Sequence, residues 1–76
     1  MNKVLQHIRA SVKIGALAVF HTTTGARFEV GRGLSGGYHA EWYGRGYVLM
    51  ASHRELTLRE AAGLVLRWEA EDEAQN

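Results

Sequence analysis

The segment Thr57–Glu71 constrains the fold more than any other part of this 76-residue chain. Thr57 and Glu60 have the spacing of a capping box, in which each side chain accepts a hydrogen bond from the other residue's backbone amide at a helix start. The apolar residues that follow recur at helical spacing and share one face: Leu58, Ala61, Ala62, Val65 and Trp68, flanked by Leu64 and Leu66. So wide a stripe must lie on a sheet, on another helix or on a second copy of the protein.

A second helix is indicated at the N-terminal end. Residues 2–12 carry an apolar stripe at helical spacing, made by Val4, Leu5, Ile8 and Val12. The next stretch is nearly all apolar, contains Gly15 and ends in β-favouring residues, so we expect a buried strand over residues 14–22. The alternative is one long helix through Phe20, followed by three strands.

The middle of the chain alternates as half-buried strands do. Phe28 and Val30 should point inward, and Tyr38–Tyr43 should place Tyr38, Ala40 and Trp42 on one face and His39, Glu41 and Tyr43 on the other. Gly44–Gly46 is typical of a tight hairpin turn. Because Tyr47–Ala51 is apolar at every position, we expect a buried central strand there.

These elements predict one small α+β domain over residues 1–76. We expect an antiparallel sheet of three or four strands with an N-terminal and a C-terminal helix packed on one face. The acidic residues 70–76 should form a frayed tail. Gly63 lies inside the last helix, where glycine costs about 1 kcal/mol relative to alanine, so another backbone should approach it, from the first helix or from a dimer mate.

Size and composition limit the ways in which this chain can be stabilised. The sequence has no cysteine, which excludes disulfides and cysteine–zinc sites. A core this small typically supplies only ~3–5 kcal/mol, so a homodimer through the C-terminal helix is a further expectation. No apolar run reaches the roughly 18 residues of a membrane span, and Val12–Phe20 lacks the cleavage site of a signal peptide. We therefore expect a cytoplasmic protein that does not bind membranes.

Charge is unevenly distributed along the chain. Residues 1–54 have a net charge of +5 and residues 55–76 a net charge of −4. The asymmetry indicates either an electronegative partner for the first part or mutual compensation of the two parts, within one fold or across a dimer.

The sequence motifs indicate no catalysis, cofactor or metal. Gly31–Gly36 matches the glycine pattern of dinucleotide-binding loops, but a strand pattern follows where such a site needs a helix. The histidines lack metal-ligand spacing, and no serine lies in a nucleophile motif. We therefore predict a non-enzymatic protein.

The residues Arg32–Tyr47 carry the strongest indication of binding. This segment mixes arginine, tyrosine and tryptophan, which dominate binding hot spots and also suit base stacking. We assign Trp42 and Tyr47 to the core. The exposed candidates for partner binding are Arg32, His39, Tyr43 and Arg45.

In size and style, over the whole chain and without a shared motif, the protein resembles the small accessory proteins of bacteriophages and mobile elements, best known from the anti-CRISPR proteins. The resemblance implies a phage-type inhibitor that occupies a surface on a host protein complex without a cofactor. Many anti-CRISPR proteins are acidic and imitate DNA, whereas this chain is nearly neutral with a basic first part.

The order of elements also resembles the double-stranded RNA-binding domain. The last helix of that family begins with a basic cluster, which Thr57–Ala62 lacks. A nucleic-acid-binding module that uses the basic, aromatic-rich first part is the alternative function.

Overall fold

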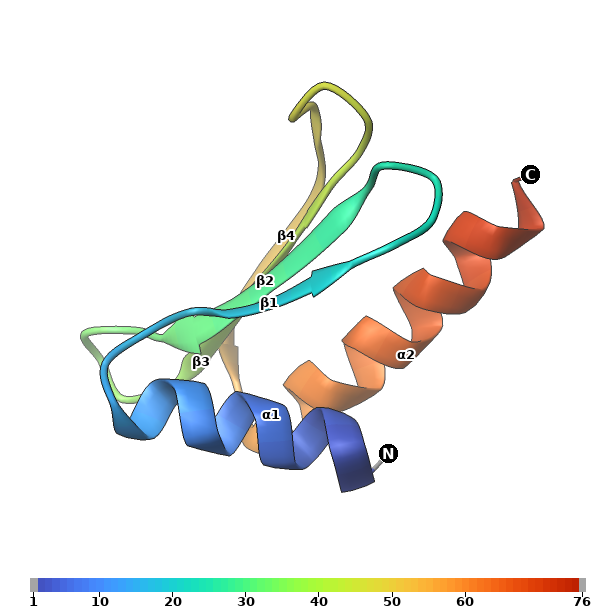
Figure 1. Cartoon of the computed structure of the whole chain (residues 1–76). Helices are drawn as coiled ribbons and strands as arrows, with labels where there is room; N and C mark the ends of the chain where they lie inside the picture. The colour runs from blue at the N-terminus through green and yellow to red at the C-terminus, as the bar shows by residue number, and fades with distance from the viewer. Residues whose placement is uncertain (1, 76) are drawn as a thin grey trace.

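The computed structural model of the protein describes residues 2–75 and shows two helices and four strands (Figure 1). Their bounds are α1 Asn2–Lys13, β1 Ala18–His21, β2 Arg27–Arg32, β3 Tyr38–Tyr43, β4 Leu49–Leu56 and α2 Leu58–Ala74. The strands form one antiparallel sheet in the order β1-β2-β3-β4. Both helices cover the same face of this sheet, so the α+β class and its architecture are confirmed.

The first helix ends where a glycine permits it. Gly15 has a φ of +77°, and the carbonyl of Ser11 accepts hydrogen bonds from the amides of Ile14 and Ala16. A glycine in the left-handed region just after the last turn is a common helix end. This stop excludes the single long helix. It also shortens the strand predicted over residues 14–22 to Ala18–His21, because the preceding residues form an exposed connection.

The capped helix begins as predicted and extends further than predicted. The Thr57 hydroxyl accepts from the amide of Glu60 at 3.1 Å, and the Glu60 carboxylate accepts from the amide of Thr57 at 2.8 Å. At the other end, α2 continues through Ala74, and the buried Asp72 accepts a hydrogen bond from the Thr24 hydroxyl at 2.7 Å. Residues 70–74 are therefore helix and not a frayed tail, because this contact ties the last turn to the β1–β2 turn.

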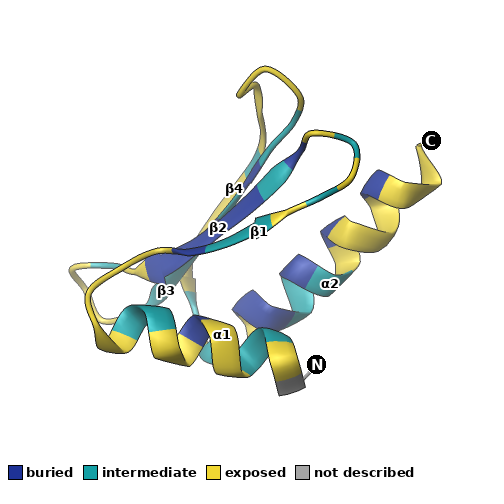
Figure 2. Cartoon of the chain, in the orientation of Figure 1, coloured by how far each residue is buried: buried dark blue, intermediate teal, exposed yellow. Residues whose placement is uncertain are grey.

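The core lies between the sheet and the two helices (Figure 2). Its largest fully buried side chains are Ile8 from α1, Phe28 and Val30 from β2, and Val65 from α2. An aromatic cluster closes the end of the core toward the hairpin: the ring centroids of Phe28, Trp42 and Trp68 lie 6.0 Å apart in each pair. Trp42 is only 6% exposed, which confirms its assignment to the core.

The strand predicted to be central lies at the edge of the sheet. β4 pairs with β3 alone, and its burial pattern is exposed at most positions. A chain that winds back and forth through consecutive antiparallel strands leaves its last strand at an edge unless a crossover intervenes. The apolar character of Tyr47–Ala51 therefore has a cause other than burial on both faces.

Candidate interaction surface

The hairpin that joins β3 to β4 projects beyond the part of the sheet covered by α1 (Figure 1). Its turn is closed by backbone hydrogen bonds from the amide of Tyr47 to the carbonyl of Gly44, at 3.1 Å, and from the amide of Gly44 to the carbonyl of Val48, at 2.7 Å. Gly46 has a φ of +78°, which explains the glycine there. The hairpin turn predicted at Gly44–Gly46 is thus confirmed.

Four consecutive apolar side chains on this hairpin are exposed to solvent. Their exposed fractions are 69% for Tyr47, 60% for Val48 and 52% for both Leu49 and Met50. We call these residues the exposed run. The assignment of Tyr47 to the core was wrong, because its ring lies against Arg27 on the face of the sheet that the helices do not cover. Runs of three or four exposed apolar residues are unfavourable for a soluble domain unless they serve binding.

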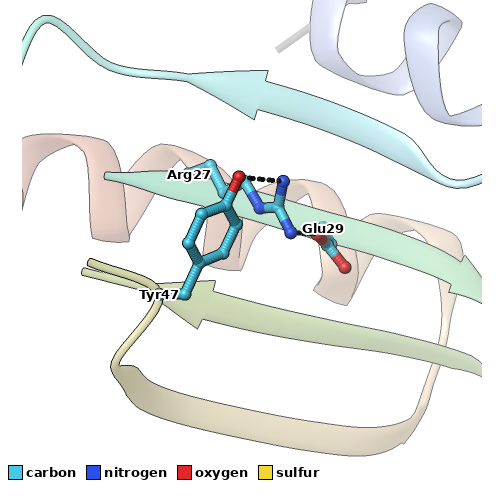
Figure 3. A network of polar contacts seen from close by, with 3 residues as sticks. All are labelled: Arg27, Glu29 and Tyr47. Atoms are coloured by element: carbon cyan, nitrogen blue, oxygen red, sulfur yellow. Dashed lines mark hydrogen bonds and ion pairs between the residues drawn. The ribbon is translucent and has the colours of Figure 1, made fainter. Parts of the chain in front are cut away.

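Tyr47 is held in an unusual conformation against the sheet. Its φ is +63°, a region that bulky residues rarely occupy. The guanidinium of Arg27 lies 4.3 Å from the centre of the Tyr47 ring, and Arg27 Nη1 donates to the Tyr47 hydroxyl at 3.4 Å (Figure 3). Arg27 Nη2 also forms an ion pair with Glu29 at 2.6 Å. The cation thus contacts both the ring and the hydroxyl of Tyr47, the first residue of the exposed run.

The face of the sheet away from the helices is polar around this arginine. Glu29 and Glu41 lie directly opposite each other on β2 and β3, where like charges repel, and the ion pair with Arg27 offsets this repulsion. Tyr43 lies on the same face, as predicted, with Arg27 5.6 Å from the centre of its ring. Partial burial raises the pKa of Tyr43, the carboxylates of Glu41 and Glu29 raise it further, and Arg27 opposes them. The phenol therefore stays protonated and can donate a hydrogen bond.

The predicted partner-binding residues separate into two groups. Tyr43 is half-buried at the hairpin end of β3, and Arg45 is exposed in the hairpin turn. His39 is half-buried near the opposite end of β3, and Arg32 lies at the end of β2, where its Nε donates to the carbonyl of Gly36 at 2.8 Å. The structure brings Tyr43 and Arg45 toward the exposed run and leaves Arg32 and His39 at the other end of the sheet.

This second group lines a polar hollow near the β2–β3 loop. The hollow has a volume of about 270 Å³, and its lining includes Arg32, His39, Glu41, Ser52 and Arg54. Two guanidinium groups and a histidine could contact a phosphate there, whereas Glu41 would repel it. The hollow is thus less specific for an anion than its arginines suggest.

The two oppositely charged parts of the chain do not compensate each other at the outer surfaces of the helices. The cations of α1 and the acids near the end of α2 are exposed: Lys3, Arg9 and Lys13 on α1, and Glu69, Glu71 and Glu73 on α2. Within residues 2–75 no ion pair joins these cations to these carboxylates, and the Arg27–Glu29 pair lies inside the basic part. The end of α2 therefore presents negative charge outward.

The histidines and the glycine-rich loop follow their local elements. Gly31–Gly36 leads from β2 into β3, so a strand follows the loop, as predicted, where a dinucleotide site needs a helix. His7 lies against Phe20, with ring centroids 4.9 Å apart. Within the described part of the chain, no three His, Cys, Asp or Glu side chains gather in an arrangement that could hold a metal ion. Over the same residues, no helix has the length and apolarity needed to cross a membrane.

No protein-family model, curated protein or solved structure matches this chain.

Two features of the surface were not predicted from the sequence. The residues of the exposed run were predicted to form a buried strand, and Arg27 was interpreted as one polar position in an alternating strand. The signal for the first was available, since the last strand of a meander lies at an edge. The role of Arg27 depends on the register that places it beside Tyr43, and on the hairpin that folds Tyr47 over it.

Proposed function

We propose that the protein is a small non-enzymatic protein-binding module that contacts its partner through the β3–β4 hairpin. The contact surface consists of the exposed run, Arg45 in the turn, and the Tyr43 and Arg27 side chains at the base. This surface combines apolar area with arginine and tyrosine, the composition typical of binding hot spots.

The exposed run is the single observation that carries this proposal. Fully burying a Val, Leu or Met side chain contributes about 1.5–3 kcal/mol. Because roughly half of each side chain is still exposed at Val48, Leu49 and Met50, a partner that covers all three would gain roughly 2–4 kcal/mol. The fixed Tyr47 ring adds rigid area at little cost in conformational entropy.

The narrower proposal is an inhibitor of the phage type, which acts by occupying a surface on a host protein complex. Its support is the resemblance in size and style to anti-CRISPR proteins, together with the hairpin as a rigid projecting element. Steric occupation requires only affinity and placement, which such a hairpin can provide without a cofactor.

A comparative pull-down tests the hairpin. Tagged wild-type protein should recover a stoichiometric protein partner from a bacterial lysate, and the Val48→Ser/Leu49→Ser variant should lose it. Leu34→Ser is the matched control, because Leu34 is fully exposed on the β2–β3 loop, away from the hairpin. Equal recovery by all three proteins, or loss with Leu34→Ser alone, would contradict the proposal.

A nucleic-acid-binding module is the second candidate, and the hollow that contains Arg32 and Arg54 is the observation that favours it. Binding dominated by phosphate contacts should weaken steeply as the salt concentration rises. A gel shift at low salt, with single-stranded and duplex probes, should then show a retarded band that Arg32→Ala/Arg54→Ala removes. The absence of any retarded band at low salt would eliminate this function.

The homodimer through the C-terminal helix stays a prediction. The sheet and α1 already cover the inner side of α2, where Ala61, Ala62, Val65 and Trp68 are buried. A second copy would have to use the outer side, near Gly63, where α1 does not approach: an added Cβ would meet no atom within 4 Å. Light scattering over a range of protein concentrations tests self-association directly.

A further inference from the structure

The large apolar side chains that stay exposed in the described part of the chain gather at two opposite ends of the sheet (Figure 1). The hairpin end consists of the β3–β4 hairpin, the β1–β2 turn and the last turn of α2, and it carries the exposed run. The loop end consists of the α1–β1 connection, the β2–β3 loop and the end of β4. It carries three apolar residues, of which Ile14 is 79% exposed, Leu17 46% exposed and Leu34 fully exposed.

We infer that the hairpin end of one copy docks on the loop end of a second copy, so that the copies associate head to tail. The inference rests on the proposed function, since it uses the hairpin as the binding element, and it names a second copy of the chain as a partner of that element. Its support is the match of the two ends in apolar surface and in charge.

The loop end has an apolar surface of its own. Leu17 precedes β1 and lies against the end of β2, because a Cβ added to Gly31 would come within 2.6 Å of the Leu17 Cδ2. Ile14 lies in the same connection, and Leu34 lies in the loop that follows β2. Single exposed apolar residues are ordinary on a protein surface, whereas a group of them is typical of a contact site. The length of the strands separates this group from the exposed run.

The hairpin end is negatively charged. The exposed carboxylates near the end of α2 are Glu69, Glu71 and Glu73, and the last turn of this helix has no basic residue. Arg45 is the cation of the hairpin turn, and its side chain lies against the β1–β2 turn, 3.8 Å from the place of a Cβ added to Gly25. Arg27 is already paired with Glu29. The carboxylates therefore outnumber the cations that could neutralise them at this end.

The loop end is positively charged. Its exposed cations are Lys13, Arg32 and Arg54. Its carboxylate is Glu55, which accepts a hydrogen bond from the Ser35 hydroxyl at 2.6 Å. The adjoining first turn of α2 adds Arg59 and Glu60, whose charges cancel. Within residues 2–75 no ion pair joins the three cations to any carboxylate, so their charge is open to another molecule.

Opposite charge at the two ends selects head-to-tail association. Two hairpin ends in contact would bring together the acidic ends of two α2 helices, and two loop ends would bring together lysine and arginine, so both two-fold arrangements are opposed by repulsion. A hairpin end on a loop end instead covers apolar surface with apolar surface and places carboxylates near cations. The uneven charge along the sequence is then compensated between copies. Because each pair keeps one free end of each kind, further copies can add.

Complementation between two variants tests the inference by sedimentation velocity. The average mass of the wild type should rise with protein concentration, up to the millimolar range. Val48→Ser/Leu49→Ser removes the apolar part of the hairpin end, and Ile14→Ser/Leu34→Ser removes that of the loop end, so each variant alone should stay a monomer. In an equal mixture, the intact hairpin end of one variant can bind the intact loop end of the other. The mixture should therefore form a dimer and nothing larger.

Charge exchange provides a second test that leaves the core untouched, because it uses exposed residues only. Lys13→Glu/Arg54→Glu and Glu69→Lys/Glu73→Lys should each weaken association by about tenfold or more, since like charges then meet. A chain that carries all four substitutions should associate again, because both ends have changed sign. Lys3→Glu is the control: it changes the charge of the same helix as Lys13, but at the start of α1 and away from the loop end (Figure 1).

The outcomes separate this inference from the proposed function. A wild type that stays monomeric at every concentration overturns the inference, as does a serine variant that associates alone or a mixture that does not dimerise. Circular dichroism checks that the serine variants are folded, and the charge variants decide the matter if they are not. If the wild type is monomeric and the lysate yields a stoichiometric partner, the proposed function stands and the inference fails. If the mixture dimerises and the lysate yields no partner, the inference stands and the function directed at a host protein fails.

Discussion

Replacing Gly63 by alanine should stabilise the protein. Glycine in a helix interior costs about 0.8–1.0 kcal/mol relative to alanine, because it loses more backbone freedom on folding. In this structure a Cβ at position 63 would meet no atom within 4 Å, and the residue lies well inside α2. Nothing within the described chain therefore offsets the gain. We expect an increase of about 1 kcal/mol in the free energy of unfolding, which for a domain of this size raises Tm by roughly 4–8 °C.

Thermal melts followed by circular dichroism, at several protein concentrations, measure this effect. Ala70→Gly is the matched control, because Ala70 is exposed on the same helix and the substitution should cost a similar ~1 kcal/mol. If Gly63→Ala lowers Tm while Ala70→Gly behaves as expected, another molecule must contact Gly63. A Tm that also falls with dilution would identify that molecule as a second copy of the protein. That result would support the homodimer and contradict the predicted stabilisation by Gly63→Ala.

Three further predictions concern the core, the helix cap and the open face of the sheet. Trp42→Ala should unfold the domain in a thermal melt, since truncating a buried tryptophan costs about 3–5 kcal/mol, comparable to the whole stability of a domain this size. Hydrogen bonding with the backbone amide of Thr57, and then with its side chain, lowers the pKa of Glu60. The contribution of Glu60 to the free energy of unfolding is therefore present above its unfolded pKa and is lost as pH falls through the lower folded pKa. In urea melts, the destabilisation caused by Glu60→Ala should accordingly become smaller in acid. A destabilisation that does not change with pH would contradict this reasoning. Because the pKa of Tyr43 is raised in the folded protein, its contribution to the free energy of unfolding is lost as pH rises beyond the ordinary pKa of about 10. Above that pH, Tyr43→Phe should therefore retain more of its neutral-pH stability than the wild type.

The helical part of the fold could be predicted from local sequence because its determinants are local. The capping box joins residues only three positions apart, and the stripe of α2 repeats within a few turns, so both appear in the sequence itself. The end of α1 could not be located from the sequence, because Gly15 inside an apolar stretch is compatible with either a helix end or a strand. The C-terminal end of α2 depends instead on a long-range contact. The hydroxyl of Thr24 donates to Asp72, which lies 48 positions further along the chain, and this contact extends α2 through residues expected to fray.

The interaction surface was harder to predict because apolar composition does not distinguish burial from exposure for function. The sequence correctly placed Tyr43 and His39 opposite Trp42, since alternation along β3 is a local property. It could not show how far the helices extend over the sheet, which decides whether Val48, Leu49 and Met50 are covered. It also could not show that Arg32 and Arg45 lie at different ends, because their separation depends on the path of the sheet.

The arrangement separates the parts of the chain that stabilise the fold from the part proposed to bind. The buried aromatic cluster lies between the helices and the sheet, whereas half or more of each residue in the exposed run is accessible to solvent. The exposed part of a leucine or methionine side chain contributes little to the free energy of unfolding, because folding does not remove that apolar area from water. The same residues promote unwanted association at an uncovered sheet edge. The buried part of Val48, Leu49 and Met50 contributes to folding, whereas the part that stays in water does not. That exposed part would lower the free energy only if another surface covered it, as the proposed function requires.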